Sequence, residues 1–129
     1  MRNMDRKTNN DNRIGAFNAY RTRMNARILE GDKAHLGIKR FFNLDSNAYK
    51  EGALDRPTKE MLGLVASMVL RCDDCILYHL INCVEAGLSE EEIVEAMNVA
   101  LVVGGSIVIP HLRRAYEALD DLFSKNEAS

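Results

Sequence analysis

The amino-acid sequence predicts an all-α protein of about five to six helices, arranged as helical hairpins. Apolar residues recur every three or four positions along most of the 129-residue chain, as on one face of a helix. No segment alternates polar and apolar residues over a useful length, which argues against strands. The length fits one ordinary domain. We therefore expect a flexible polar N-terminus at residues 1–12 and a single helical domain over residues 13–125.

The first half of the domain is expected to hold three helices. Apolar residues spaced by three and four predict helices at 14–29 and 33–42, and a loop rich in Asn, Asp, Ser and Gly follows at 43–53. Asp55 can cap the free amide groups of the next helix, and Pro57 is tolerated in its first turn. That helix continues to residue 70.

The second half of the domain is expected to hold three more helices. A helix at 72–86 ends at Gly87, which suits a left-handed C-cap. The run Ser89-Glu90-Glu91-Glu92 is a capping box, and it starts a helix at 90–103. Two glycines and a serine break this helix, and a last helix follows at 107–123.

Residues 61–70 of the third helix are apolar on nearly every side. Either the core or a subunit interface must cover such a helix. Because a domain of this size offers too little cover of its own, the segment predicts an oligomer.

Charge and hydropathy exclude several classes of protein. The net charge is -2 and the pI about 5.9, which argues against a nucleic-acid binder that acts through a basic surface. The first 40 residues are nevertheless basic and the remainder is acidic. No apolar run approaches the roughly 18 residues that span a bilayer, and no secretory signal is visible, so we expect a cytoplasmic protein without membrane contact.

The segment Arg71-Cys72-Asp73-Asp74-Cys75-Ile76-Leu77-Tyr78-His79 carries the most chemical information. On a helix, Cys72, Cys75 and His79 share one narrow face. Cys75 and His79 have the (i, i+4) spacing at which side chains meet, so the imidazole can take the thiol proton. The Cys-x-x-Cys spacing can close a short disulfide, and a helix N-terminus stabilises a thiolate. These are the parts of a dithiol redox centre.

The same residues admit other interpretations. Cys72, Cys75 and His79 could supply three of about four zinc ligands, although no second Cys/His cluster is found. Cys83 is most simply a small buried hydrophobe. From the sequence alone, Glu60 is expected to be an exposed first-turn carboxylate.

The last helices carry a histidine and two groups of charged residues. His111 is either a pocket residue or, more simply, a histidine at a helix start. The pair Arg113-Arg114 and the acidic run at 90–92 are expected to be solvated.

The residues from Glu60 onward resemble the carboxymuconolactone decarboxylase family, in its alkylhydroperoxidase D-like branch. The resemblance rests on Glu60, on Cys72-x-x-Cys75-x-x-x-His79, and on Gly87, Ser89 and Glu92-Ile93 before an Ala/Val-rich helix; it covers about residues 55–119. It implies an all-helical fold that assembles as a homodimer, homotrimer or homohexamer, with the hexamer favoured. It also implies an antioxidant thiol peroxidase that needs no metal or organic cofactor.

By analogy with that branch, Cys75 is the attacking thiolate, His79 and Glu60 form its proton relay, and Cys72 resolves the sulfenic acid. The substrate would be a peroxide, and a dithiol reductant would reset the pair. Helix-dipole stabilisation favours Cys72 as the nucleophile and pairing with His79 favours Cys75; we follow the pairing.

The chain departs from the family's pattern at one position, and two functions other than a peroxidase stay open. Better-known peroxidase members carry a histidine where this chain has Asp74, and its negative charge disfavours a nearby thiolate. The family also includes a lyase of aromatic catabolism, 4-carboxymuconolactone decarboxylase, which generally has no redox Cys pair. A third possibility is a non-enzymatic module that binds zinc, or binds an acidic partner through the basic N-terminal arm.

Overall fold

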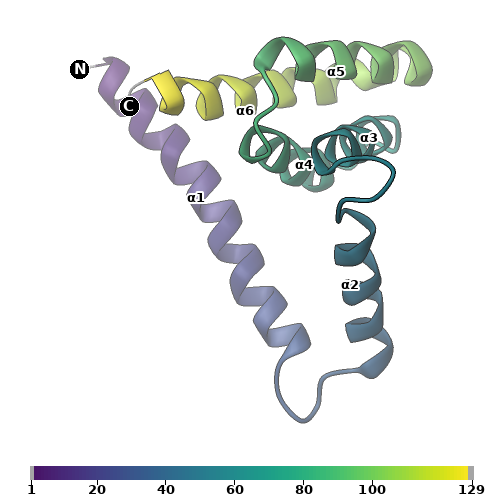
Figure 1. The fold of residues 1–129 in the computed structure, drawn as a ribbon. Coiled ribbons are helices and arrows are strands. Elements are labelled where there is room, and N and C mark those ends of the chain that lie inside the picture. The colour runs from purple at the N-terminus through teal and green to yellow at the C-terminus, as the bar shows by residue number, and fades with distance from the viewer. Residues whose placement is uncertain (1, 128–129) are drawn as a thin grey trace. The chain divides into compact units, whose positions relative to one another are not determined.

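A computed structural model of the chain describes the backbone of residues 2–127 and the side chains of residues 13–124. Within these residues the chain forms six α-helices, one short 3-10 helix and no strand, which confirms the all-α prediction (Figure 1). Internal contacts divide the chain into two compact units, residues 1–50 and residues 51–129. That residues 13–125 form one domain stays a prediction.

The first unit begins with α1, Arg2–Leu29, which starts well before the residue 14 predicted from the apolar spacing. Most of the added residues are polar, so the apolar pattern could not reveal them. The predicted flexibility of residues 1–12 concerns side chains that lie outside the described residues, and it stays a prediction.

The second helix of this unit, α2, covers Leu36–Ala48. His35 is its N-cap, and the ring atom Nδ1 accepts hydrogen bonds from the amide groups of Gly37 at 3.1 Å and Ile38 at 3.4 Å. The loop predicted at 43–53 is wrong over its first half, because the helix continues to Ala48. Asn43 and Asn47 lie one turn apart on it and are joined by a side-chain hydrogen bond of 3.3 Å.

The second unit holds the remaining elements: α3 Arg56–Val69, α4 Asp73–Glu85, α5 Glu90–Gly104, the 3-10 helix η1 Ser106–Val108, and α6 Ile109–Glu127. Each α-helix matches a predicted helix within a few residues. No helix among the described residues is both long enough and apolar enough to cross a membrane.

The predicted caps of these helices are confirmed. Asp55 accepts a hydrogen bond of 2.9 Å from the amide of Thr58 and so starts α3. Ser89 and Glu92 make both bonds of the capping box at the start of α5. Gly87 has φ +92°, the left-handed conformation expected after α4.

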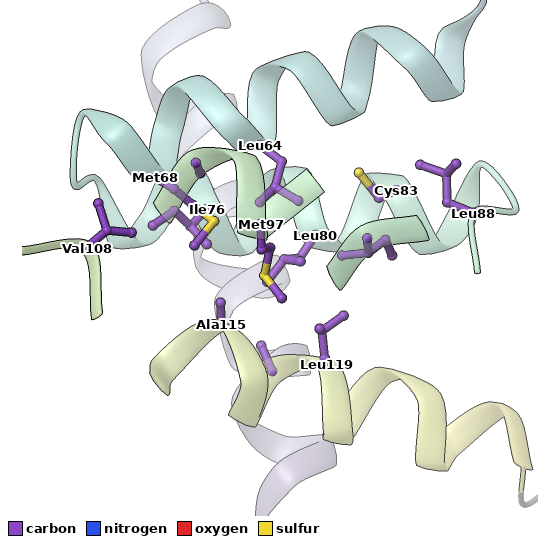
Figure 2. Packing of buried hydrophobic residues seen from close by; sticks show 13 residues of the cluster. Leu64, Met68, Ile76, Leu80, Cys83, Leu88, Met97, Val108, Ala115 and Leu119 are labelled. Atoms are coloured by element: carbon purple, nitrogen blue, oxygen red, sulfur yellow. The ribbon is translucent and has the colours of Figure 1, made fainter. Parts of the chain in front are cut away.

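The apolar core of this unit joins all four α-helices (Figure 2). Its largest fully buried side chains come from each helix in turn: Leu64, Met68, Leu80, Cys83, Ile93, Met97, Val108 and Leu119. Close packing of this kind fixes the positions of α3 and α4 relative to each other. These two helices carry the residues singled out in the sequence.

One side of α3 is only partly covered within this unit. Together with α5 it lines an apolar groove of about 700 Å³, which includes Met61, Leu62, Val65, Ala96 and Val99. Met61 and Val65 also pack against the core. Leu62 is 55% exposed and Val99 is 52% exposed. The helix predicted to be apolar on every side therefore buries only one of its faces within this unit.

Candidate active site

The two helices that carry the candidate residues meet at a tight corner. α3 ends at Val69 with Leu70 as its C-cap, and Arg71 takes the left-handed conformation with φ +61°. The amide of Arg71 donates to the carbonyl of Met68, and the amide of Cys72 donates to the carbonyl of Ser67, both at 3.1 Å. These are the two bonds of a Schellman motif. Cys72 is at the same time the N-cap of α4, so one residue both closes α3 and opens α4.

The two motif cysteines lie together at this helix start. The sulfurs of Cys72 and Cys75 are at disulfide-bonding distance, with their Cα atoms 5.2 Å apart. The Cys75 amide donates a hydrogen bond of 3.3 Å to Sγ of Cys72. Cys75 is exposed and Cys72 is half-buried. A pair in this position has solvent access, and the amide groups of the first turn favour negative charge on sulfur.

A buried carboxylate of α3 and a buried imidazole of α4 form a pair. Nδ1 of His79 lies 2.9 Å from Oε2 of Glu60, and the two residues are only 7% and 3% exposed. The expectation from the sequence that Glu60 is an exposed first-turn carboxylate is therefore wrong. Glu60 shares the inner face of α3 with Leu64, Ser67 and Met68, and burial is tolerated because α4 supplies a partner.

Asn82 is half-buried and is a third member of this group, and it was not among the residues predicted from the sequence. Its Nδ2 lies 3.4 Å from both carboxylate oxygens of Glu60. Asn82 follows His79 by three residues on α4, which puts both side chains on the same face. That spacing is the signal that could have identified Asn82, once Glu60 was known to face α4.

The third cysteine lies in the core, as predicted. Cys83 has no solvent exposure and is a free thiol. Burial raises the pKa of the Cys83 thiol to about 12, and the nearby charge of Glu60 acts in the same direction. Because the thiolate is the reactive form, Cys83 is inert at neutral pH.

His111 and Arg114 of α6 contact the first turn of α4. Nδ1 of His111 lies 2.7 Å from Oδ1 of Asp73, and Nη1 of Arg114 lies 3.3 Å from Oδ2 of the same carboxylate. Asp73 directly follows Cys72, so this group borders the cysteine pair. Arg114, predicted to be merely solvated, takes part in an ion pair although its side chain is 62% exposed.

The described residues contain no cluster of three or more His, Cys, Asp or Glu side chains that could hold a metal ion. The structure brings Cys72 and Cys75 together, and it brings Glu60 and His79 together. The site therefore combines an accessible cysteine pair with a buried acid-base pair. The cysteine pair lies at the start of α4, and the acid-base pair joins α3 to α4, the two helices that meet at the corner.

Comparisons with known proteins extend these observations. The family model described as "Carboxymuconolactone decarboxylase family" matches residues 38–118. A curated protein of Paracoccus denitrificans, "Uncharacterized protein 4 in cox locus", is 29% identical over 82 residues, which cover 64% of this chain and 74% of that protein.

Solved structures show the same relationship. Two crystal structures of TM1620 from Thermotoga maritima superpose with TM-scores of 0.83 and 0.82 at 55% and 56% identity. Each alignment covers 88% of this chain, and it covers 98% of the TM1620 chain in the first structure and 94% in the second. One of them is described as a carboxymuconolactone decarboxylase family protein with a suggested role in the antioxidative response.

A more distant structure has the same fold. The apo form of lpg0406 from Legionella pneumophila, a carboxymuconolactone decarboxylase family protein, gives a TM-score of 0.71 at 26% identity over 88% of this chain and 96% of its own. Family model, helical fold and structural relatives agree, and the chain belongs to the carboxymuconolactone decarboxylase family.

Proposed function

We propose that this protein is a thiol-dependent hydroperoxidase and disulfide oxidoreductase that works through Cys75, Cys72, His79 and Glu60. The observation that carries the proposal is the placement of an accessible cysteine pair, at disulfide distance, at the start of α4, the helix that also carries His79, whose imidazole is paired with the buried Glu60 of α3. Burying a carboxylate and an imidazole is costly even when the two are paired, so this pair is a candidate for a chemical role.

The first chemical step is attack of the Cys75 thiolate on a hydroperoxide ROOH. The sulfur forms a bond to the terminal peroxide oxygen, the O–O bond breaks, and the alkoxide leaves and takes up a proton to become ROH. Cys75 is oxidised to the sulfenic acid and the peroxide is reduced. The exposure of Cys75 supports its role as the attacking residue, because a peroxide can reach it without a change of fold.

The second step regenerates a stable state of the enzyme. The Cys72 thiol attacks the sulfenic sulfur of Cys75, the disulfide forms, and the hydroxyl leaves as water. An external dithiol then reduces the disulfide by thiol–disulfide exchange and is itself oxidised to a disulfide. The short distance between the two cysteines supports this step, because no rearrangement of helices is needed.

Glu60 and His79 activate the nucleophile in this proposal. His79 lies one turn after Cys75, the spacing at which helix side chains meet, and accepts the thiol proton. Glu60 accepts the hydrogen bond from Nδ1 of His79 and so selects the tautomer whose Nε2 acts as the base. Asn82 donates to the same carboxylate, at 3.4 Å from both oxygens, and limits its rotation.

Two further features support the wider proposal. TM1620, which is 56% identical in sequence to this chain, has a suggested role in the antioxidative response. We also propose self-association into a dimer, trimer or hexamer, because apolar side chains remain exposed along one side of α3 and along α5: Leu62, Leu70, Val99, Val102 and Val103. Exposed apolar surface of this kind is typical of an interface.

The direct test is a thiol map after peroxide treatment. Reduced protein is exposed to cumene hydroperoxide, alkylated, digested and analysed by mass spectrometry. We expect a Cys72–Cys75 disulfide, while buried Cys83 serves as the internal control that never joins it. In Cys72→Ser, a sulfenic acid trapped by dimedone should accumulate on Cys75. Alkylatable Cys72 and Cys75 after treatment would contradict the proposal.

Variants separate this activity from the alternatives. Cys75→Ser should abolish peroxide turnover, whereas a lactone decarboxylase would keep its activity and a zinc module would lose bound metal. Equal peroxide consumption by wild type and Cys75→Ser would refute the peroxidase. Sedimentation or light scattering of the reduced wild type tests self-association independently.

A further inference from the structure

A glycine of α3 lies directly against the imidazole of the proposed base. A Cβ atom at Gly63 would lie 2.5 Å from Cε1 of His79 and 2.8 Å from each of its two ring nitrogens. Real Cβ atoms are essentially never found at such separations. The imidazole therefore occupies the space in which any other residue at position 63 would place its side chain.

Nothing in the backbone of α3 requires a glycine at this position. Gly63 lies inside the helix and is not among the residues with positive φ. Glycine weakens a helix interior, because it loses more conformational freedom on folding than other residues. Close approach of a neighbouring group is the remaining reason for a glycine here, and the group that approaches is His79.

The position of Gly63 is itself held from the corner that carries the cysteines. The hydroxyl of Ser67 donates a hydrogen bond of 2.7 Å to the carbonyl of Gly63. The carbonyl of Ser67 accepts the bond from the Cys72 amide. Since Glu60 precedes Gly63 by three residues on the same helix face, this one stretch of α3 sets both the carboxylate and the space for the ring.

We propose that Gly63 is a positioning residue that admits the His79 imidazole against α3 and thereby holds it on Glu60. The inference rests on the proposed thiol chemistry, in which His79 accepts the Cys75 proton. A side chain at position 63 displaces the ring, breaks its contact with the carboxylate and deprives Cys75 of its base. Gly63 supplies no reacting group of its own and acts only through His79.

The test compares Gly63→Ala with a matched variant, Gly104→Ala. A Cβ at Gly104 would lie 2.5 Å from Cγ2 of Val108, so this change introduces a contact as close, at the end of α5; its next neighbour is Cα of Val69 at 3.8 Å, and His79 is not among its three nearest contacts. Two readouts are measured on each reduced protein. The first readout is the reactivity of Cys75, measured as the pH profile of its alkylation and as the rate of hydroperoxide-driven disulfide formation. The second readout is the set of imidazole nitrogen signals of His79 in NMR spectra.

In Gly63→Ala, we expect Cys75 to react at least about tenfold more slowly at pH 7, since a positioned base contributes a factor of about 100 or more. The alkylation profile should move to higher pH, and the His79 signals should lose the pattern of an Nδ1–H bonded to a carboxylate. Gly104→Ala should lower the melting temperature and leave both readouts unchanged. Unchanged His79 signals in folded Gly63→Ala would overturn the inference.

The two hypotheses fail in different ways. If wild-type Cys75 does not react with hydroperoxide, the proposed function fails, while the NMR readout still decides whether Gly63 positions His79. If Gly63→Ala does not fold, His79→Ala is compared with the double variant His79→Ala/Gly63→Ala. Removal of the ring should let the methyl group fit, so the double variant should melt no lower than His79→Ala. A lower melting temperature in the double variant would contradict the inference.

Discussion

The buried thiol of Cys83 should make the stability of the protein depend on alkaline pH. Its pKa is about 12 in the folded protein, against an ordinary value of 9.0. Because the folded pKa is the higher one, the folded state keeps its proton above pH 9 while the unfolded chain releases it. The stabilising effect is thus complete below pH 9 and is lost between pH 9 and 12.

The size of the effect follows from the difference between the two pKa values. Each pH unit in this window lowers the free energy of unfolding by about 1.4 kcal/mol, so about 2 kcal/mol is lost by about pH 10.5. Cys83→Ala removes the titrating group and leaves a small cavity, which costs about 1 kcal/mol at neutral pH. The variant should therefore be the less stable protein at pH 7 and the more stable one at pH 10.5.

Urea denaturation of wild type and Cys83→Ala at several pH values measures this difference directly. Both proteins are kept with Cys72 and Cys75 oxidised, so that these sulfurs do not titrate, and tyrosines and lysines contribute equally to both. Parallel stability curves between pH 7 and 10.5 would refute the reasoning, because Cys83 would then ionise as readily in the folded protein as in the unfolded chain. Replacing Glu60 by Gln should bring the folded pKa of Cys83 closer to its ordinary value and so reduce the loss of stability at high pH, since the charge of Glu60 is the second cause of the high pKa.

Three other substitutions test separate parts of the structure. Glu60→Gln should slow the reaction of Cys75 with iodoacetamide and lower stability by about 1–2 kcal/mol in urea melts, because the amide offers one acceptor where the carboxylate serves both His79 and Asn82; an unchanged rate would remove Glu60 from the relay. Arg71→Gly should stabilise the protein by about 0.5–1 kcal/mol, since φ +61° suits glycine; a loss of stability on thermal melting would contradict this. Ser89→Ala should cost about 1 kcal/mol through loss of the cap of α5, and unaltered chemical denaturation would show that the cap contributes nothing.

Local signals made most of the fold predictable from the sequence. Asp55, the Ser89 capping box and Gly87 each act within a few residues, so their effect is visible in the sequence and is confirmed in the structure. The end of α2 was missed because Asn and Ser are typical of loops, yet here Asn43 and Asn47 bond along the helix. Local propensity is a weak guide where side chains support each other one turn apart.

The candidate site was predictable only in part, for a physical reason. The relation of Cys72, Cys75 and His79 depends on the spacing within one helix, which the sequence contains. The burial of Glu60 depends on how α3 packs against α4, and no pattern within α3 reports that. The same packing decides the roles of Asn82 and Gly63, neither of which carries chemistry that a sequence motif would reveal.

The shared use of Cys72 by two helices restricts how this protein can vary in length. Arg71 is the only residue between Leu70, the C-cap of α3, and Cys72, the N-cap of α4. A residue inserted there would separate the Schellman bonds from the cap and move α4 away from the carboxylate that it must meet. The interval of twelve positions from Glu60 to Cys72 is therefore a structural constant. Relatives with another interval are expected to have lost the buried pair, even where both cysteines remain.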